Sequence, residues 1–156
     1  MKKIKAFTLV ELLVTIAVLA ILAMMAAPSM SQILHNSKVN SSSGDVLNFL
    51  QQSRSEAIRL GSAVTVCASS DGASCVTGNK TNWAVGIIAK SGSVTIQKLT
   101  FDNSAIAITA PDSITFNSVG STNNNYTIAI SMPRASINYS VCVEVIGRAS
   151  KSKVGC

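Results

Sequence analysis

The first 28 residues, MKKIKAFTLVELLVTIAVLAILAMMAAP (Met1–Pro28), decide most of what this sequence predicts. Three lysines stand among the first five positions, and an apolar run then extends from Thr8 to Ala27 with a single charge, Glu11. As a helix, this run would measure about 30 Å, which is the thickness of a bilayer core. The stretch therefore predicts a membrane-spanning helix near the start of this sequence.

The charges around this run indicate its orientation. The three lysines before it are expected to stay on the cytoplasmic side, so the rest of the chain should lie across the membrane. A plain signal anchor is the alternative, but a carboxylate within a membrane segment costs about 2.5–3.5 kcal/mol at the bilayer centre and usually has a partner. Ala26-Ala27-Pro28 is also a poor signal-peptidase site, because proline follows the cut.

Phe7-Thr8-Leu9-Val10-Glu11-Leu12-Leu13, behind a short basic leader, resembles the class III leader of type IV pilins. The resemblance implies that a prepilin peptidase cuts between Ala6 and Phe7 and methylates the new amine of Phe7. It also implies that Glu11 meets this amine of a neighbouring subunit inside a fibre. The family usually has glycine before the cut, and slower cleavage is the expected effect of Ala6 at that place.

Composition agrees with one exported domain. About 128 residues follow the apolar run, enough for a single compact head with its own core. The net charge of +6 falls to +3 without the three leader lysines, so bulk charge alone does not identify a nucleic-acid binder.

The four cysteines, Cys67, Cys75, Cys142 and Cys156, predict disulfides. None stands in a CxxC pair and no histidine cluster accompanies them, which argues against a zinc site. Four cysteines allow three connectivities. The local pairs 67–75 and 142–156 are the most economical, and the pilin resemblance favours them as well.

Periodicity changes along the chain and divides it into regions. Apolar residues at helical spacing continue to Leu60, and Gly61 is a plausible C-cap, so one helix is expected from about Phe7 to Leu60. Its weakest part is 36–44, which is rich in Ser, Asn and Gly and could be a break. Beyond Gly61 the period becomes two, with expected strands at 63–68, 83–90, 94–101, 105–109, 113–117, 126–131 and 137–146.

These regions predict an α+β, pilin-like fold in which a long N-terminal helix packs on an antiparallel sheet or sandwich. The expected organisation is a leader at 1–6, a transmembrane and assembly helix at 7–28, an amphipathic helix at 29–60 and a disulfide-stapled β head at 61–156.

The head carries a second resemblance. The segments Val64-Thr65-Val66-Cys67, Trp83-Ala84-Val85-Gly86, Ile114-Thr115-Phe116-Asn117-Ser118 and Gly147-Arg148, followed by a final cysteine, are similar to FimT/GspH-type minor pilins. This resemblance implies a head of two antiparallel sheets and incorporation at low abundance near the tip of a fibre.

The tail carries the candidate binding residues. Arg148, Lys151 and Lys153 crowd the loop that a 142–156 disulfide would close, and cations on a short constrained loop can contact successive phosphates. Some FimT-like pilins of competent bacteria bind DNA through Gly-Arg-x-Arg at this place. Arg148 matches the first arginine, whereas Ser150 replaces the second. Arg134 is a further candidate, and a solvated basic turn is the alternative.

Catalytic patterns are missing from the sequence. His35 is the only histidine, and the sequence contains no Gly-rich phosphate loop, nucleophile elbow or zinc spacing. We therefore expect no enzyme activity, no cofactor and no metal.

Three functions remain. The chain is expected to be a structural minor pilin, a minor pilin that also captures DNA in natural transformation, or a type II secretion pseudopilin. The expected partners are other pilins and minor pilins, prepilin peptidase, the inner membrane and non-specific DNA. The head would lie in the periplasm before assembly into an extracellular pilus.

Overall fold

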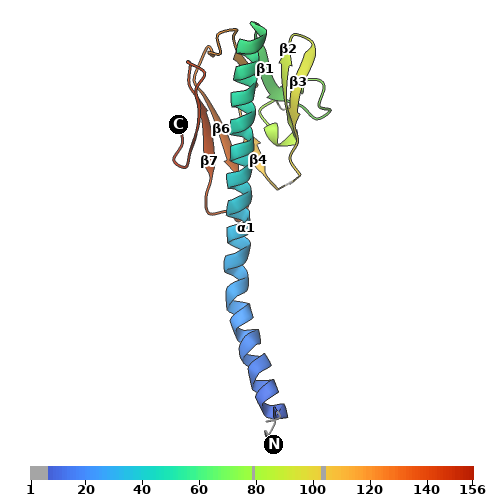
Figure 1. Cartoon of the computed structure of the whole chain (residues 1–156), viewed down its shortest axis with the longest axis vertical. Helices are drawn as coiled ribbons and strands as arrows, with labels where there is room; N and C mark the ends of the chain where they lie inside the picture. Colours follow the sequence, from blue (N-terminus) through green and yellow to red (C-terminus); the bar gives the residue numbers. More distant parts are fainter. Residues whose placement is uncertain (1–6, 79, 103–104) are drawn as a thin grey trace, which may run out of the picture.

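The computed structural model describes residues 7–78, 80–102 and 105–156, and the side chains of 25–29 lie outside this description. The predicted leader, 1–6, and the residue before the predicted cut, Ala6, therefore lie outside the described residues. A long helix, α1, runs the length of the molecule, and the rest of the chain forms a head around its second half (Figure 1).

Helix α1 spans Leu9–Leu60 without interruption. Thr8 is its N-cap, and Gly61, in the left-handed conformation at φ 60°, closes its C-terminus by donating to the carbonyls of Ala57 and Ile58. Both ends thus agree closely with the sequence, and the possible break at 36–44 does not occur.

Tertiary contacts hold this weak segment in the helix. Val39, Ser43 and Val46 are fully buried at spacings of four and three, which places them on one face. Beside them, the Asn36 side chain accepts from Ser136 N at 2.9 Å and donates to Ser136 Oγ at 3.0 Å. Packing and side-chain bonds therefore override the low helix propensity of these residues.

The first half of α1 extends beyond the head (Figure 1). Its large apolar side chains from Leu9 to Leu34, wherever described, are each at least half exposed. Within the residues that could be searched, no helix is long and apolar enough to cross a membrane. The predicted span ends at 25–27, whose side chains lie outside the description.

The head consists of two four-stranded antiparallel sheets. The first has the order β3-β2-β1-β5, with β1 Val64–Ala68, β2 Ile87–Ser91, β3 Val94–Leu99 and β5 Ser113–Phe116. The second has the order β4-β6-β7-β8, with β4 Ala107–Thr109, β6 Tyr126–Ser131, β7 Tyr139–Val143 and β8 Ala149–Ser152. The second half of α1 packs against both, so the expected fold class is confirmed.

Two predicted strands were partly wrong. The segment 83–90 begins as a 3-10 helix, Trp83–Val85, because Asn82 caps it and the buried Trp83 indole donates to the carbonyl of Pro111 at 3.1 Å. The segment 137–146 is a shorter strand, β7, followed by a turn at 144–148. The next strand, β8, was not expected from the sequence.

The core lies between the helix and the two sheets. Val46, Leu50 and Ala57 on α1 are fully buried, as are Val66 on β1 and Val141 on β7. One polar bridge crosses this core: Gln97 Nε2 donates to the Phe49 carbonyl at 2.9 Å and to Ser53 Oγ at 2.8 Å. Helix and head are therefore one packed unit from Val39 onward.

Candidate functional site

Two regions contain most of the predicted functional residues, and the first is the start of α1. Phe7 is exposed, and Thr8 and Glu11 form a reciprocal capping box. Thr8 N donates to Glu11 Oε2 at 3.3 Å, and Glu11 N donates to Thr8 Oγ1 at 3.2 Å. In the single chain, the Glu11 carboxylate therefore already has a hydrogen-bonding partner on its own helix.

The second region is the C-terminal hairpin, which consists of β7, the turn 144–148 and β8. Glu144 N donates to the Arg148 carbonyl at 2.9 Å and Gly147 N to the Glu144 carbonyl at 2.7 Å, which closes the turn. Cys156 is bonded to Cys142 near the C-terminal end of β7, with 5.5 Å between their Cα atoms. The tail thus folds back over the sheet, and the predicted basic loop contains a strand.

A tight junction fixes this hairpin to the rest of the head. Gly147 has φ 78° and is buried, and a Cβ added to it would lie 1.7 Å from the Gly120 carbonyl oxygen. Arg54 of α1 donates from Nε to that same oxygen at 2.9 Å and from Nη2 to the Ile146 carbonyl at 3.2 Å. Only glycine permits this approach at 147, because it has no Cβ and accepts a positive φ.

The four predicted cations do not form one cluster. Arg148 is exposed and ends the turn just before β8, and Lys151, three residues further along the chain, lies about 10 Å away. Arg134, with φ 69°, lies in the connection between β6 and β7, at the other end of β7 from Arg148. The structure therefore separates Arg134 from Arg148 by the length of a strand.

Lys151 and Lys153 flank the Tyr139 ring. Their ammonium groups lie 4.8 Å and 5.9 Å from the ring centroid, within the range of cation–π contacts. Lys151 Nζ also donates to Asn40 Oδ1 of α1 at 2.9 Å. Lys151 thus ties the edge strand β8 to the helix, whereas Lys153, among the described residues, contacts only the Tyr139 ring.

Arg54 and Asn40 are site residues that sequence reasoning missed. Arg54 contacts carbonyls 66 and 92 positions away, and Asn40 meets a lysine 111 positions away. Both are ordinary polar residues of a helix, so the neighbouring sequence gives no indication of these contacts.

The other disulfide closes a small loop. Cys67 and Cys75 are bonded, with 5.7 Å between their Cα atoms, and both bridges are the local pairs that the resemblance implies. Inside the loop, the Asp71 carboxylate accepts hydrogen bonds from the Ser74 hydroxyl, from the backbone N–H groups of Ser74 and Ala73, and from the Ser69 hydroxyl. These donors, the Ser74 hydroxyl foremost, hold the pKa of Asp71 well below its usual range.

Acid is expected to loosen this loop. The pKa of Asp71 is lower in the folded chain than in the unfolded chain, so the ionised carboxylate stabilises the folded loop. This stabilisation is complete above the pKa of an unfolded aspartate and is lost as pH falls below about 4. Amide exchange of residues 72–75, measured from pH 6 down to pH 2, should accelerate relative to the rest of the head. In Asp71→Asn the acid-dependent part of this acceleration should vanish. An identical pH profile in the variant would contradict the role of Asp71.

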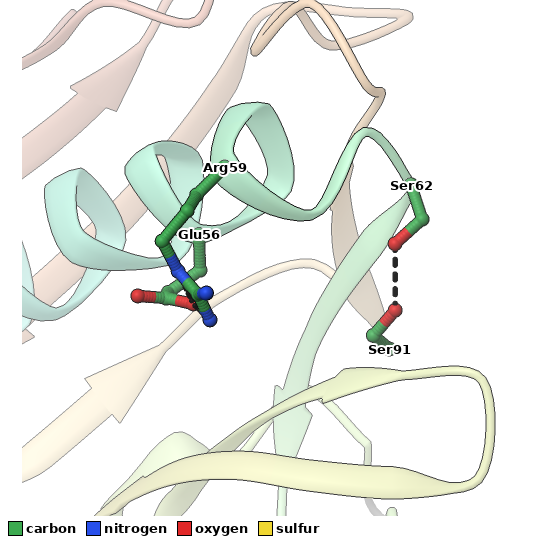
Figure 2. Close-up of polar contacts among 4 residues, drawn as sticks. All are labelled: Glu56, Arg59, Ser62 and Ser91. Carbon is green, nitrogen blue, oxygen red and sulfur yellow. Dashed lines mark hydrogen bonds and ion pairs between the residues drawn. The ribbon is translucent and has the colours of Figure 1, made fainter.

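A groove of about 390 Å³ lies between the C-terminal end of α1 and the hairpin of β2 and β3. It is lined by Leu60, Val94 and Ile96, with Arg59 and Ser91. Arg59 donates to Glu56 at 2.6 Å and 2.9 Å, and the Ser62 and Ser91 hydroxyls lie 2.9 Å apart (Figure 2). The Arg59–Glu56 pair is the one ion pair found within the described part of the chain.

A helix half inside and half outside a two-sheet head, together with an N-terminal methylation-type sequence, defines the class of pilin-like proteins. The family model described as "Type II transport protein GspH" matches residues 43–147, and the prokaryotic N-terminal methylation motif matches residues 1–27. The chain therefore belongs to the GspH family of minor pilins and pseudopilins.

Solved structures agree on the fold. Two crystal forms of the type IV minor pilin FimU from Pseudomonas aeruginosa are similar to this chain, with TM-scores of 0.61 and 0.56 and identities of 17% and 18%. The alignments cover 74% and 72% of this chain and 89% and 91% of the FimU chains. No curated protein sequence matches at a significant level.

Proposed function

We propose that this chain is a minor subunit of a type IV pilus, held in the inner membrane by residues 7–28 before it enters the fibre. The observation that carries this proposal is the first half of α1, which extends beyond the head and exposes its large apolar side chains. Such a surface needs either lipid or other helices around it. A bundle of pilin helices would supply the second environment.

Processing at the amino terminus is part of the proposal. Prepilin peptidase would cut between Ala6 and Phe7 and methylate Phe7, in agreement with the methylation motif at 1–27. Glu11 would then exchange its Thr8 contact for the amine of a neighbouring subunit. The new partner would be a cationic amine, so the contact would add the attraction of opposite charges to a hydrogen bond on the carboxylate.

The family also includes type II secretion proteins, so a pseudopilin is the alternative function. The presence of the chain in sheared surface fibres distinguishes a pilus subunit from a pseudopilin. In cells that lack the pilus assembly ATPase, the chain should disappear from sheared fibres, and in cells that lack the secretion ATPase it should remain. The reverse pattern would assign the chain to type II secretion.

DNA contact by the C-terminal hairpin is a second proposed function, in support of DNA uptake during natural transformation. Arg148 and Lys153 favour it, because both are exposed and neither belongs to the ion pair found among the described residues. Lys151 and Arg134 add positive charge to the same sheet, although Lys151 also binds Asn40. These groups would contact phosphates without reading sequence. We propose no catalytic role for any residue.

Salt dependence tests the DNA proposal. Each phosphate contact contributes roughly −0.9 to the log–log salt slope of binding, so Arg148→Ala/Lys153→Ala should make the slope on duplex DNA less steep by about 1.8. Lys90→Ala/Lys98→Ala removes the same charge from the other sheet and is the matched control. Equal slopes for the two double variants, or no binding at low salt, would overturn DNA contact by the hairpin.

A further inference from the structure

We infer that Arg54 of α1 is a phosphate-contacting residue of the same surface, beside Arg148. This inference rests on the proposed DNA contact and deepens it, because it assigns the second guanidinium that the tail sequence lacks. Ser150 occupies the position where a second arginine would follow Arg148, and it lies on β8 opposite Cys142.

The position of Arg54 follows from the turn that it holds. Its Nε and Nη2 donate to the carbonyls of Gly120 and Ile146, and a Cβ added to Gly147 would lie 2.9 Å from that Nε. Arg148 is the next residue along the chain. The helix therefore delivers a guanidinium to the turn that ends at Arg148.

Arg54 keeps donors and charge available for a ligand. A guanidinium has five N–H donors, and the bonds to Gly120 and Ile146 use two of them, so about three do not donate to these carbonyls. Both acceptors are neutral, and within the described chain the ion pair belongs to Arg59 and Glu56. Arg54 is only half-buried, and its bond to Ile146 lies at the surface, so the outer edge of the guanidinium faces solvent.

The Arg54 side chain is already held in place before any ligand binds. A flexible lysine loses rotamer freedom when it contacts a phosphate, whereas Arg54 is already held by two bonds in the free protein. A planar guanidinium also suits bidentate contact with phosphate oxygens. We therefore expect Arg54 to contribute at least as much to affinity as the exposed Lys153.

Glu144 opposes this binding. It is exposed and lies in the same turn, where its N–H closes the loop onto Arg148. A carboxylate here lowers the positive potential that phosphates meet. Glu144→Gln should therefore increase DNA affinity severalfold at low salt and lose this gain at high salt.

The experiment compares four full-length variants in nonionic detergent, each binding a 20-base-pair duplex across a salt series: Arg54→Gln, Arg54→Lys, Arg148→Ala and Arg59→Gln. Arg54→Gln should make the slope less steep by about 0.9, as one lost phosphate contact requires. Arg54→Lys should keep the wild-type slope, because it keeps the charge. Arg59→Gln removes a charge from the same helix on the side of the other sheet and should change nothing (Figure 2).

The outcomes separate this inference from the proposal beneath it. A normal slope in Arg54→Gln together with a reduced slope in Arg148→Ala would overturn the inference and leave DNA contact in place. Equal loss of affinity in Arg54→Gln and Arg54→Lys, at the wild-type slope, would show that Arg54 only positions the turn, and would also overturn it. No change in either Arg54→Gln or Arg148→Ala would remove DNA contact itself.

A second measurement uses the wild-type chain and needs no folded variant. The Nε–H resonances of Arg54 and Arg148 should both shift when duplex DNA is titrated, while that of Arg59 stays unchanged. An Arg54 resonance that does not move at saturating DNA would overturn the inference.

Discussion

Gly147→Ala is expected to lower the free energy of unfolding by about 3 kcal/mol or more, the largest stability effect that we predict for a single substitution. The added Cβ would lie 1.7 Å from the Gly120 carbonyl oxygen, so the backbone of one turn must move. The move would also break the two bonds that Arg54 donates, each worth about 1 kcal/mol. Denaturant unfolding of the full-length chain measures the effect.

Gly92→Ala is the matched control. Gly92 also has a positive φ, 58°, but a Cβ added there meets nothing within 4 Å. Its cost should be only the left-handed conformation of alanine, about 1–2 kcal/mol. Equal losses in the two variants would show that the junction of Gly147, Gly120 and Arg54 adds nothing to stability.

This junction gives the Gly-Arg pair of the tail two separate roles. Gly147 is required by packing alone, because it touches Gly120 and Arg54 inside the head. Arg148 is exposed, and no other residue that the structure describes forms an ion pair with it. A Gly-Arg sequence at this place is therefore evidence for the turn, and only the arginine bears on DNA contact.

Glu11→Ala is expected to remove the chain from fibres while it leaves the head folded. The proposed partner of Glu11 in a fibre is the amine of Phe7 of a neighbouring subunit, and alanine cannot form that ion pair. In the single chain, the substitution removes only one half of the capping box, a local loss of about 1 kcal/mol far from the core. Immunoblots of sheared fibres and of membranes measure the distribution.

Thr8→Ala distinguishes the role of helix capping from the role of the Glu11 carboxylate. It removes the hydroxyl that caps α1 and keeps the Glu11 carboxylate, so incorporation should persist. Wild-type amounts of the Glu11→Ala chain in fibres would remove Glu11 from the assembly mechanism. Loss of both variants would show that the cap, rather than the charge, is what assembly needs.

The helix and most strands could be predicted from the sequence because their signals are local. Apolar spacing and the Gly61 cap locate the end of α1, and alternation locates β1 and β6. The strand β8 gave no such signal, because Ala149–Ser152 contains no large apolar residue. It forms a hairpin with the neighbouring strand β7, and its Lys151, which lies over the Tyr139 ring, is also held by Asn40, 111 positions away in the sequence.

The candidate site was only partly predictable for the same reason. The exposed cations Arg148 and Lys153 are visible in the sequence, as are the four cysteines. The separation of Arg134 from Arg148, and the approach of Arg54 to the hairpin, depend on strand order and on the face that α1 turns toward the second sheet. Neither follows from local spacing.

The most direct test of the central claim, that this chain is a processed subunit of a pilus, is mass spectrometry of sheared surface fibres. We predict a peptide that begins at Phe7, carries one methyl group on its amine and co-purifies with the fibres. Detection of the chain only in membranes, or with residues 1–6 still attached, would contradict the account.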